Sequence, residues 1–477
     1  MRKLFVLASA ALLILGVVGC NEKPSEYGYV VNDNQIVYNT PPRPADQQSM
    51  LGFACDPIEH VRVGVIGLGD RGKDVPKRFA YIEDATIVAL CDIDTAKIAR
   101  AQRSLVKRGA PRAIAEYTGE DGWMELCQRE DIDLVYLAVP WQYHTKMAVY
   151  AMEHGKHVAV EVPAAMNIAE CWQLIDTSEK TRKHCMMLEN CVYDFFEMTA
   201  LNMAQQGLFG EIIHVEGAYI HNLDPFWKEY HSNWRLRYNA THKGDVYPTH
   251  GIGPVCQVLD IHRGDKMNYL VSMDTKAVHG VNIAKEQLNE TELQELGITP
   301  EEFANGDHVV TLIRTEKGKQ IEIQHNVFTR RPYNRLYSLT GIDGYACKYP
   351  IEAFALKTEN LSEEGLDYQN LDGERFVSPE LQKELMQKYS HPIVADIEAK
   401  AKEVGGHGGM DFIMDYRLIY CLRNGLPLDQ DVYDAAEWSC LTELSAISIE
   451  YGSMPVEIPD FTRGDWNKVQ GYRHAVK

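Results

Sequence analysis

The residues best suited to chemistry lie just after position 60. An apolar run, Val61–Ile66, leads into Gly67, Gly69 and Gly72, and Asp92 follows twenty residues later at the end of a second apolar run. The first glycine of such a turn allows a tight bend, the second lets a pyrophosphate approach the backbone, and the third lets a helix pack on the strand. The acid accepts hydrogen bonds from a ribose, and its charge repels a 2′-phosphate. The spacing therefore predicts a dinucleotide site that favours NAD over NADP.

The elements that position this turn alternate along the first half of the chain. Apolar runs predict strands over 61–66, 86–91, 133–139, 157–160 and 185–188. Helical periodicity falls between them, over 71–81, 94–108, 120–129, 142–154 and 167–181. This alternation predicts a parallel sheet with helices on both faces, in which ligands bind beyond the carboxyl ends of the strands. The segments just after the strands are 67–72, 92, 140–144, 161–163 and 189–190.

The second half of the chain has a different pattern. Residues alternate between apolar and polar over 212–219, 308–314, 320–327 and 336–341, which predicts strands of a largely antiparallel sheet. Residues 358–378 are polar and aperiodic and are predicted to form a long loop, whereas 379–452 are mostly helical. We therefore predict an α/β protein with an N-terminal Rossmann domain, 58–192, that has a parallel doubly wound sheet. A C-terminal α+β domain, 193–477, with a largely antiparallel open sheet follows it.

The first 57 residues predict where the protein resides. Arg2 and Lys3 precede an apolar run that ends in Gly19 and Cys20, a pattern typical of an export signal over residues 1–20. The segment Val17-Val18-Gly19-Cys20 is similar to a bacterial lipobox, in which the cysteine is lipidated; an ordinary cleaved signal is the alternative. Residues 21–57 are polar and proline-rich, which predicts a flexible tether. We expect an exported protein, lipid-anchored in a bacterial cell envelope at the periplasm or cell surface.

Composition narrows the possible partners. The net charge is −20, which argues against nucleic acid and against direct binding to an anionic membrane surface. The eleven cysteines have no zinc-site spacing, so no metal site is predicted.

Several motifs together resemble one family. The chain is similar to the oxidoreductases typified by glucose-fructose oxidoreductase and inositol dehydrogenase. Within them it resembles glycoside hydrolase family 109, the NAD-dependent α-N-acetylgalactosaminidases. The resemblance spans residues 58 to 475 and rests on Gly67–Gly72, Trp141–His144, Glu161–Ala164, Glu189–Tyr193, Asn233–Arg235, Gly244–Gly251, Arg331–Tyr333 and Gly405–Phe412.

The resemblance implies specific contacts. For NAD it implies the turn glycines and the following contacts: Asp70, Arg71, Asp92, Trp141, Gln142, Tyr143, His144, Glu161, Val162 and Asn190. For the sugar, a terminal α-N-acetylgalactosamine of a glycan, it implies Tyr219, Arg235, Tyr247, Pro248, Thr249, His250 and Tyr333. It also suggests a homodimer formed through the sheet of the second domain.

The resemblance further implies an exo-glycosidase that works by oxidation at sugar C3, elimination of the C1 substituent, addition of water and reduction. The wider family carries a proton-transferring lysine where this chain has Val162, and valine cannot move a proton. We predict His250 and Tyr193 as the main acid/base groups, because an imidazole titrates near neutral pH. Tyr247 would place the sugar, and Glu161 would orient the nicotinamide side or a proton carrier.

Three functional readings follow from the sequence. The first is the NAD-dependent exo-glycosidase. The second is an NAD-dependent sugar dehydrogenase, or a glycosidase with a different sugar specificity. The third is a sugar-binding lipoprotein that kept the fold without catalysis, since fold alone does not establish activity.

Overall fold

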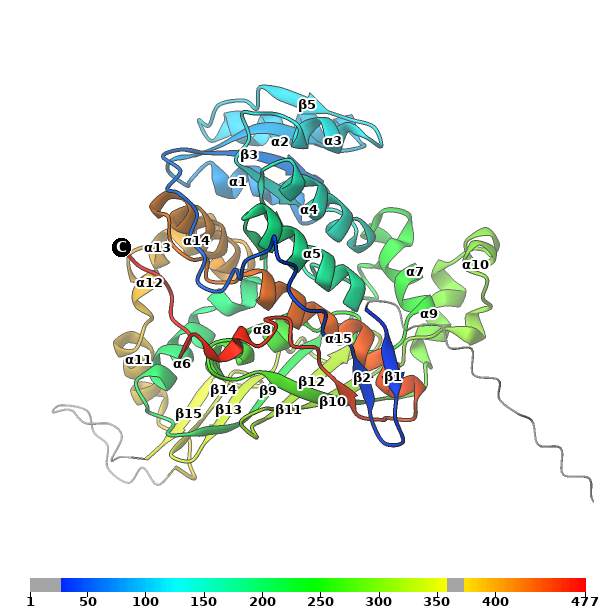
Figure 1. The fold of residues 1–477 in the computed structure, drawn as a ribbon, viewed down its shortest axis with the longest axis vertical. Helices are drawn as coiled ribbons and strands as arrows, with labels where there is room; N and C mark the ends of the chain where they lie inside the picture. The colour runs from blue at the N-terminus through cyan, green and yellow to red at the C-terminus, as the bar shows by residue number, and fades with distance from the viewer. Residues whose placement is uncertain (1–26, 358–372) are drawn as a thin grey trace, which may run out of the picture.

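The computed structural model describes residues 27–357 and 373–477, and Figure 1 shows two domains stacked along the long axis. The signal predicted over 1–20, with Cys20, and most of the loop predicted over 358–378 lie outside the described residues. A parallel six-stranded sheet forms the N-terminal domain, and a ten-stranded sheet forms the opposite end of the molecule. The predicted fold class, a Rossmann domain followed by an α+β domain with a largely antiparallel sheet, is confirmed.

The Rossmann sheet is parallel throughout and has the order β5-β4-β3-β6-β7-β8. Its strands are β3 (Val61–Ile66), β4 (Ala85–Cys91), β5 (Ala115–Tyr117), β6 (Leu134–Leu137), β7 (His157–Val160) and β8 (Cys185–Met187). The connecting helices are α1 (Val75–Phe79), α2 (Thr95–Lys107), α3 (Gly122–Cys127), α4 (His144–Glu153) and α5 (Ile168–Thr181). Strand β5 was not predicted, because its three residues are too few to show a period.

The larger sheet has the order β1-β2-β16-β10-β11-β12-β9-β13-β14-β15. Its strands are β1 (Tyr29–Val31), β2 (Ile36–Tyr38), β9 (Ile212–Ile220), β10 (Met267–Asp274), β11 (Val309–Thr315), β12 (Gln320–Asn326), β13 (Tyr337–Gly341), β14 (Gly344–Cys347), β15 (Ala353–Leu356) and β16 (Val456–Glu457). Most neighbours are antiparallel, but β12 pairs with β9 in parallel, as β16 does with β2.

Helices join the two sheets. They are α6 (Phe195–Gln205), α7 (Trp234–Thr241), α8 (Thr249–Val258), α9 (His279–Gln287), α10 (Glu290–Leu296), α11 (Pro379–Lys388), α12 (Pro392–Ala395), α13 (Glu398–Val404), α14 (Met410–Asn424) and α15 (Val432–Glu450). The long helix α15 packs against α5 and β8 on one side and against β10 on the other, so it lies between the domains (Figure 1). Because α15 is buried along most of its length, it ties both sheets into one continuous core.

The flexible tether predicted over 21–57 is wrong for its described part, residues 27–57. Strands β1 and β2 form a hairpin, and the Ile36 amide donates to the Pro455 carbonyl at 2.9 Å, which attaches the hairpin to the large sheet. Ile36, Tyr38 and Met50 are buried. The prolines of this segment disfavour a helix but are compatible with extended chain at a sheet edge. A few buried apolar side chains are enough to hold such a segment on the folded protein.

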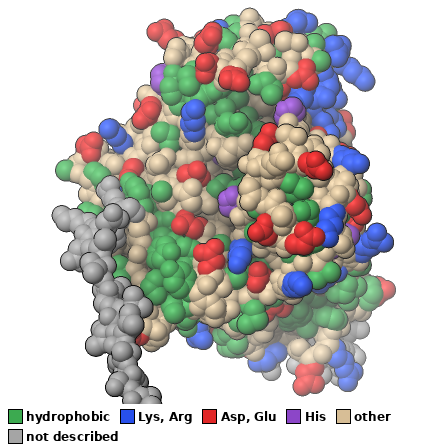
Figure 2. Space-filling view, turned by 90° about the vertical axis from the view of Figure 1, so that its right-hand side faces the viewer, with side chains coloured by type: hydrophobic (Ala, Val, Ile, Leu, Met, Phe, Trp, Pro, Cys, Tyr) green, Lys and Arg blue, Asp and Glu red, His purple; other side chains and the backbone are tan. Residues whose placement is uncertain are grey.

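The charged surface is mixed. Figure 2 shows acidic and basic side chains interspersed over the face that it presents, despite the net charge of −20. Among the described residues, none of the helices is long and apolar enough to cross a membrane.

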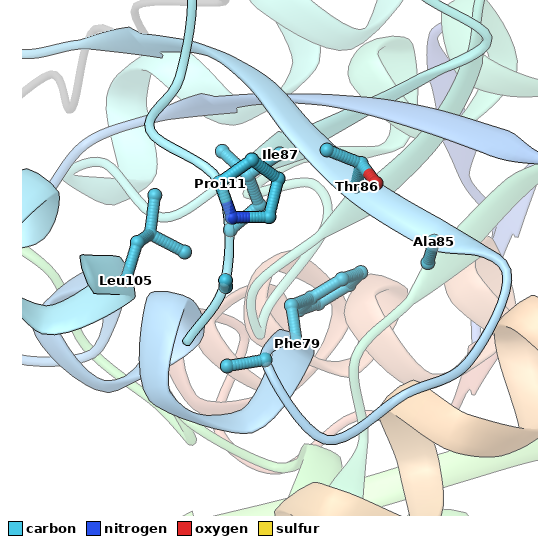
Figure 3. A pocket seen from close by; sticks show the side chains of 8 residues that line it. Phe79, Ala85, Thr86, Ile87, Leu105 and Pro111 are labelled. Carbon is cyan, nitrogen blue, oxygen red and sulfur yellow. The ribbon is translucent and has the colours of Figure 1, made fainter. Parts of the chain in front are cut away.

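A small apolar hollow of about 20 Å³ lies inside the Rossmann domain, away from the strand ends that bind ligands. In Figure 3 it is bordered by Phe79, Ile87, Leu105 and Pro111. It is about the size of one water and offers almost no polar partner, so we treat it as a packing defect.

Candidate active site

A large cleft of about 1080 Å³ runs between the two domains. One wall consists of segments that follow β3, β4, β6, β7 and β8, and the other of residues from β9 and from the segments around α7 and α8. This volume exceeds what one sugar needs and is at the upper end for small-molecule sites. The cleft therefore has room for an elongated ligand together with a second one.

The first wall fits a dinucleotide. Gly67 has a φ of +88°, and a Cβ there would lie 2.2 Å from the Ala138 carbonyl oxygen. A Cβ at Gly72 would lie 1.9 Å from the Gly67 oxygen, so Gly72 makes a close packing contact and does not line the cleft. A Cβ at Gly69 would meet nothing within 4 Å, and Gly69 does line the cleft. The turn is thus closed on its inner side and open where a pyrophosphate would approach.

Asp92 directly follows β4 beside this turn. Its carboxylate accepts hydrogen bonds from the backbone N–H groups of Leu68, at 2.7 Å, and Asp94, at 2.9 Å. These bonds fix the carboxylate at the edge of the cleft, where it is placed to meet a ribose. Lys97 Nζ lies 3.7 Å from it.

Polar side chains at the ends of β7 and β8 continue this wall. Arg71 donates from Nε to Glu161 Oε1 at 3.1 Å, and Asn190 donates from Nδ2 to Asp411 Oδ1 at 2.6 Å. Val162 lines the cleft next to Glu161. Glu161 is therefore paired with a cation of the glycine turn, which suits an orienting role better than proton transfer.

His144, at the start of α4, has both ring nitrogens engaged. Nδ1 lies 2.7 Å from the Pro163 carbonyl oxygen and Nε2 lies 2.8 Å from that of Val139. Burial lowers the pKa of His144, against the opposing effect of these carbonyls. The ring therefore ties two strand-end loops together and leaves no nitrogen for a ligand. The predicted contacts Asp70, Gln142 and Tyr143 line the same cleft.

Residues of the second wall, together with Trp141 from the segment after β6, form an aromatic enclosure around one arginine. Trp141 stacks on Tyr247 with ring centroids 5.4 Å apart and planes at 21°. The Arg235 guanidinium carbon lies 4.5 Å from the Tyr247 ring centroid, 5.1 Å from that of Trp141 and 5.8 Å from that of Tyr219. Aromatic faces stabilise such a cation, and aromatic walls also suit the apolar faces of a sugar ring.

Arg235 has a hydrogen-bond donor without an acceptor among the described residues. One of its terminal nitrogens donates to the Tyr230 hydroxyl at 2.8 Å, whereas its buried Nε has no partner among the described residues. A buried N–H without an acceptor is costly. Because Arg235 itself lines the cleft, its guanidinium is placed to donate to an oxygen-bearing ligand, in agreement with the predicted sugar contact.

His250, on the first turn of α8, is the best candidate for a proton carrier. Its Nδ1 lies 2.8 Å from both carboxylate oxygens of Glu189, and its side chain is 13% exposed at the cleft. Burial opposes the ionisation of Glu189, but the charge of His250, with hydrogen bonds from His250 and from the Cys191 amide, lowers its pKa. An ionised carboxylate only accepts hydrogen bonds, so Nδ1 carries the proton and Nε2 remains for a ligand.

The tyrosines of the cleft are poor bases. Burial raises the pKa of Tyr247 well above its ordinary value, and the nearby Arg235 offsets this only in part. Burial also raises the pKa of Tyr219. Tyr219 and Tyr333 both line the cleft, and Tyr333 is 43% exposed at its rim. These hydroxyls therefore act as neutral hydrogen-bonding groups, which supports the predicted placing role of Tyr247.

Besides Gly72, three predicted site residues do not line the cleft. Tyr193 is fully buried, and its hydroxyl donates to Asp429 Oδ2 at 3.2 Å. Because the turn Asn190–Tyr193 directs the ring away from the cleft, this position does not support proton transfer by Tyr193. Pro248 and Thr249 are buried at the start of α8, where they shape the turn that presents Tyr247 and His250.

Glu189 was not among the predicted site residues. The signal was present, since an acid directly follows the last strand of the parallel sheet, but its partner is 61 residues away in the chain. Glu189, Cys191 and His250 also form the one cluster of metal-ligating atoms found among the described residues. Arg335 lies 2.8 Å from Cys191 Sγ, so a cation there would meet a second positive charge.

Two family profiles together cover most of the chain. Residues 193–468 match the glycosyl hydrolase 109 C-terminal domain, and residues 61–189 match the oxidoreductase family with an NAD-binding Rossmann fold. Among relatives, glycosyl hydrolase family 109 protein 1 of Bacteroides fragilis (strain YCH46) is 59% identical over 436 residues, which cover 91% of this chain and 92% of that protein. The glycosyl hydrolase family 109 protein of Porphyromonas gingivalis is 58% identical over 442 residues, 92% of this chain and 93% of that protein.

Solved structures share the fold at low sequence identity. Levoglucosan dehydrogenase in complex with NADH and levoglucosan matches with a TM-score of 0.60 and 17% identity, over 84% of this chain and 100% of that one. The WlbA dehydrogenase of Bordetella pertussis, in complex with NADH and UDP-GlcNAcA, matches with a TM-score of 0.57 and 14% identity, over 85% and 99%. With these matches and the cleft described above, the chain belongs to glycosyl hydrolase family 109 and is a glycoside hydrolase built on an NAD-binding oxidoreductase fold.

Proposed function

We propose that this protein is an exo-glycosidase that removes terminal α-N-acetylgalactosamine with an NAD that is held through every turnover. The observation that carries the proposal is the shared cleft, in which His250 faces the same space as the glycine turn. Val162 occupies the position where the resembling dehydrogenases have a lysine, which argues against simple alcohol oxidation. The motifs quoted from the sequence support the choice of sugar.

The proposed reaction needs a redox group beside a proton carrier. A bound NAD supplies reversible hydride transfer at sugar C3, which acidifies C2 and allows the C1 substituent to leave by elimination. Other glycosidases commonly use two carboxylates on either side of the scissile bond. Here the Glu189 carboxylate holds His250 with its Nε2 available, so His250 is placed to remove and return a proton.

The aromatic wall would bind and orient the sugar. The Arg235 guanidinium would donate to a sugar oxygen, and Tyr247 offers a neutral hydroxyl. Trp141 and Tyr219 narrow this part of the cleft and reduce the access of water. Exclusion of water strengthens each of these polar contacts.

A chromogenic substrate tests the proposal. The purified protein should release nitrophenol from 4-nitrophenyl α-N-acetylgalactosaminide without net accumulation of NADH. In heavy water the released sugar should carry deuterium at C2. The α-galactoside, which lacks the acetamido group, is the matched control for specificity and should react more slowly.

Other outcomes identify the alternatives. NADH formed in amounts equal to the sugar consumed indicates a sugar dehydrogenase. Faster release from a different sugar indicates another glycosidase specificity. Binding of NAD and sugar with no turnover of any glycoside indicates a sugar-binding protein without catalysis.

We also propose that the protein is exported and lipid-anchored through Cys20. A cofactor that is regenerated in each cycle needs no external supply of NAD, which makes such a location compatible with the reaction. Labelling of growing cells with a fatty-acid analogue tests this, because Cys20→Ser should abolish labelling of the protein.

A further inference from the structure

One buried carboxylate connects the cofactor wall to the C-terminal domain. Asp411, on the first turn of α14, accepts from Asn190 Nδ2 at 2.6 Å and from Arg71 at 3.3 and 3.4 Å. His407 Nδ1 lies 3.0 Å from it, and the guanidinium of Arg78 lies 3.8 Å away. Burial opposes ionisation, but Arg71, His407 and Arg78 hold the pKa of Asp411 well below its usual range. Asp411 is therefore a fixed negative charge shared by four donors.

Three of these donors line the cleft, although Asp411 itself does not. Arg71 belongs to the glycine turn, Asn190 follows β8, and His407 comes from the second domain. Asp411 lies outside the cleft lining and bonds to three residues that do line it, so it can affect a ligand only through them. Its own role is therefore to position other residues.

The segment Gly405–Gly409 closes around this carboxylate. His407 and all four glycines have positive φ values, between +47° and +118°. A Cβ at Gly406 would lie 2.8 Å from Asp411 Cβ, so the loop passes directly over that side chain. The loop places the half-exposed His407 ring 3.2 Å from Arg71.

We propose that Asp411, with the segment Gly405–Gly409, forms an interdomain lock that retains the dinucleotide between turnovers. Arg71 and Asn190 are held in place from the C-terminal domain, and His407 covers Arg71 on the cleft side. Release of the cofactor then requires this junction to open. The inference rests on the proposed function, in which NAD is recycled and never exchanged during catalysis.

The test compares two neighbouring carboxylates. Asp411→Asn keeps the shape but removes the charge. Asp415→Asn is the control: Asp415 is equally buried on α14 and also contacts Arg78, at 2.6 Å, and the Tyr136 hydroxyl, but it bonds to none of the three donors that line the cleft. The NAD that remains after exhaustive dialysis is quantified by enzymatic cycling, and the affinity for added NADH is measured from its fluorescence. Thermal unfolding reports the folding of each variant.

Loss of charge-assisted hydrogen bonds predicts that D411N releases the cofactor about tenfold faster than the wild type, with a similar rise in the KM for NAD rather than a fall in kcat. The His407→Ala variant should release NAD about threefold faster than the wild type. The effect is smaller because the His407 side chain is half-exposed, so that water can replace its contacts. D415N should release NAD at the wild-type rate.

Two results overturn the lock. One is unchanged release in folded D411N and H407A, and the other is equally fast release in D411N and D415N, which indicates a general structural role. Wild-type protein that binds no NAD or NADH overturns the proposed function as well, so the two failures are distinguishable.

Discussion

The two walls of the cleft are built in different ways. The cofactor wall depends on backbone: two tight glycines, one open glycine and loops that follow parallel strands. The sugar wall depends on side chains brought together from β9, α7, α8 and the segment after β6. Binding by the cofactor wall should therefore tolerate side-chain substitutions except at the glycines. Binding or catalysis at the sugar wall should fail when one of its side chains is removed. The predictions below test this difference.

The largest effect should come from the sugar wall. His250→Asn removes the proton carrier while keeping a similar volume, so kcat should fall about a thousandfold, within the range for general acid–base catalysis. The content of bound NAD should remain at the wild-type level, because His250 does not touch the glycine turn. Nitrophenol release and cofactor quantification on the same preparation check both halves of this prediction.

Glu189→Gln should give a smaller loss, about ten- to a hundredfold in kcat, because the imidazole stays but its orienting charge is gone. A loss as large as that of H250N would mean that Glu189 itself meets the substrate. Activity of H250N at the wild-type level would remove His250 from the reaction, and activity of E189Q at the wild-type level would mean that the orienting charge is not needed.

Prediction from sequence succeeded where the signal was local. The glycine turn and Asp92 lie within 26 residues of each other, and the strand before the turn fixes their geometry. Glu189 was missed as a site residue because its partner His250 depends on how α8 packs against the last parallel strand. The relation is tertiary and leaves no local pattern.

Two differences between the sequence expectations and the structure share one physical cause. Tyr193 stands only four residues after Glu189, but a short 3-10 turn directs its ring to Asp429 and away from the cleft. Strands β1 and β2 were not predicted from their polar, proline-rich segment, because strands of three residues are too short to show a period. In both cases the conformation of a short segment depends on tertiary contacts with residues far away in the sequence.

On the cofactor wall, two glycines should behave oppositely. Gly72→Ala places a methyl group against the Gly67 oxygen and should lower the free energy of unfolding by about 1–3 kcal/mol. Gly69→Ala has open space, so stability should change by less than about 0.5 kcal/mol, while affinity for NAD falls about tenfold. Chemical denaturation and NADH fluorescence separate the two. Equal loss of stability in both variants would contradict the open space on the cleft side of Gly69.

A buried acid beneath the sugar wall should give a pH dependence. Burial raises the pKa of Asp245 from 3.8 to about 7, although the Tyr247 amide donates to it. The folded state therefore favours the neutral acid, so this stabilisation is complete at low pH and is lost as the pH rises through about 7. Between about pH 5 and about pH 8, the wild type should lose about 2–3 kcal/mol more stability than Asp245→Asn. Urea denaturation at both pH values measures this, and parallel curves would contradict it.

The smallest effect should come from Tyr193→Phe. The variant loses one hydrogen bond to Asp429, but Arg417 still donates to that carboxylate at 2.7 and 2.8 Å. We expect the free energy of unfolding to fall by about 1 kcal/mol and kcat to change less than about twofold. Tyr247→Phe, on the sugar wall, is the matched control and should lower activity more. A tenfold loss of kcat in Y193F with unchanged stability would contradict this prediction. It would mean that the turn after β8 rearranges when the sugar binds, so that Tyr193 leaves the core and contacts the sugar.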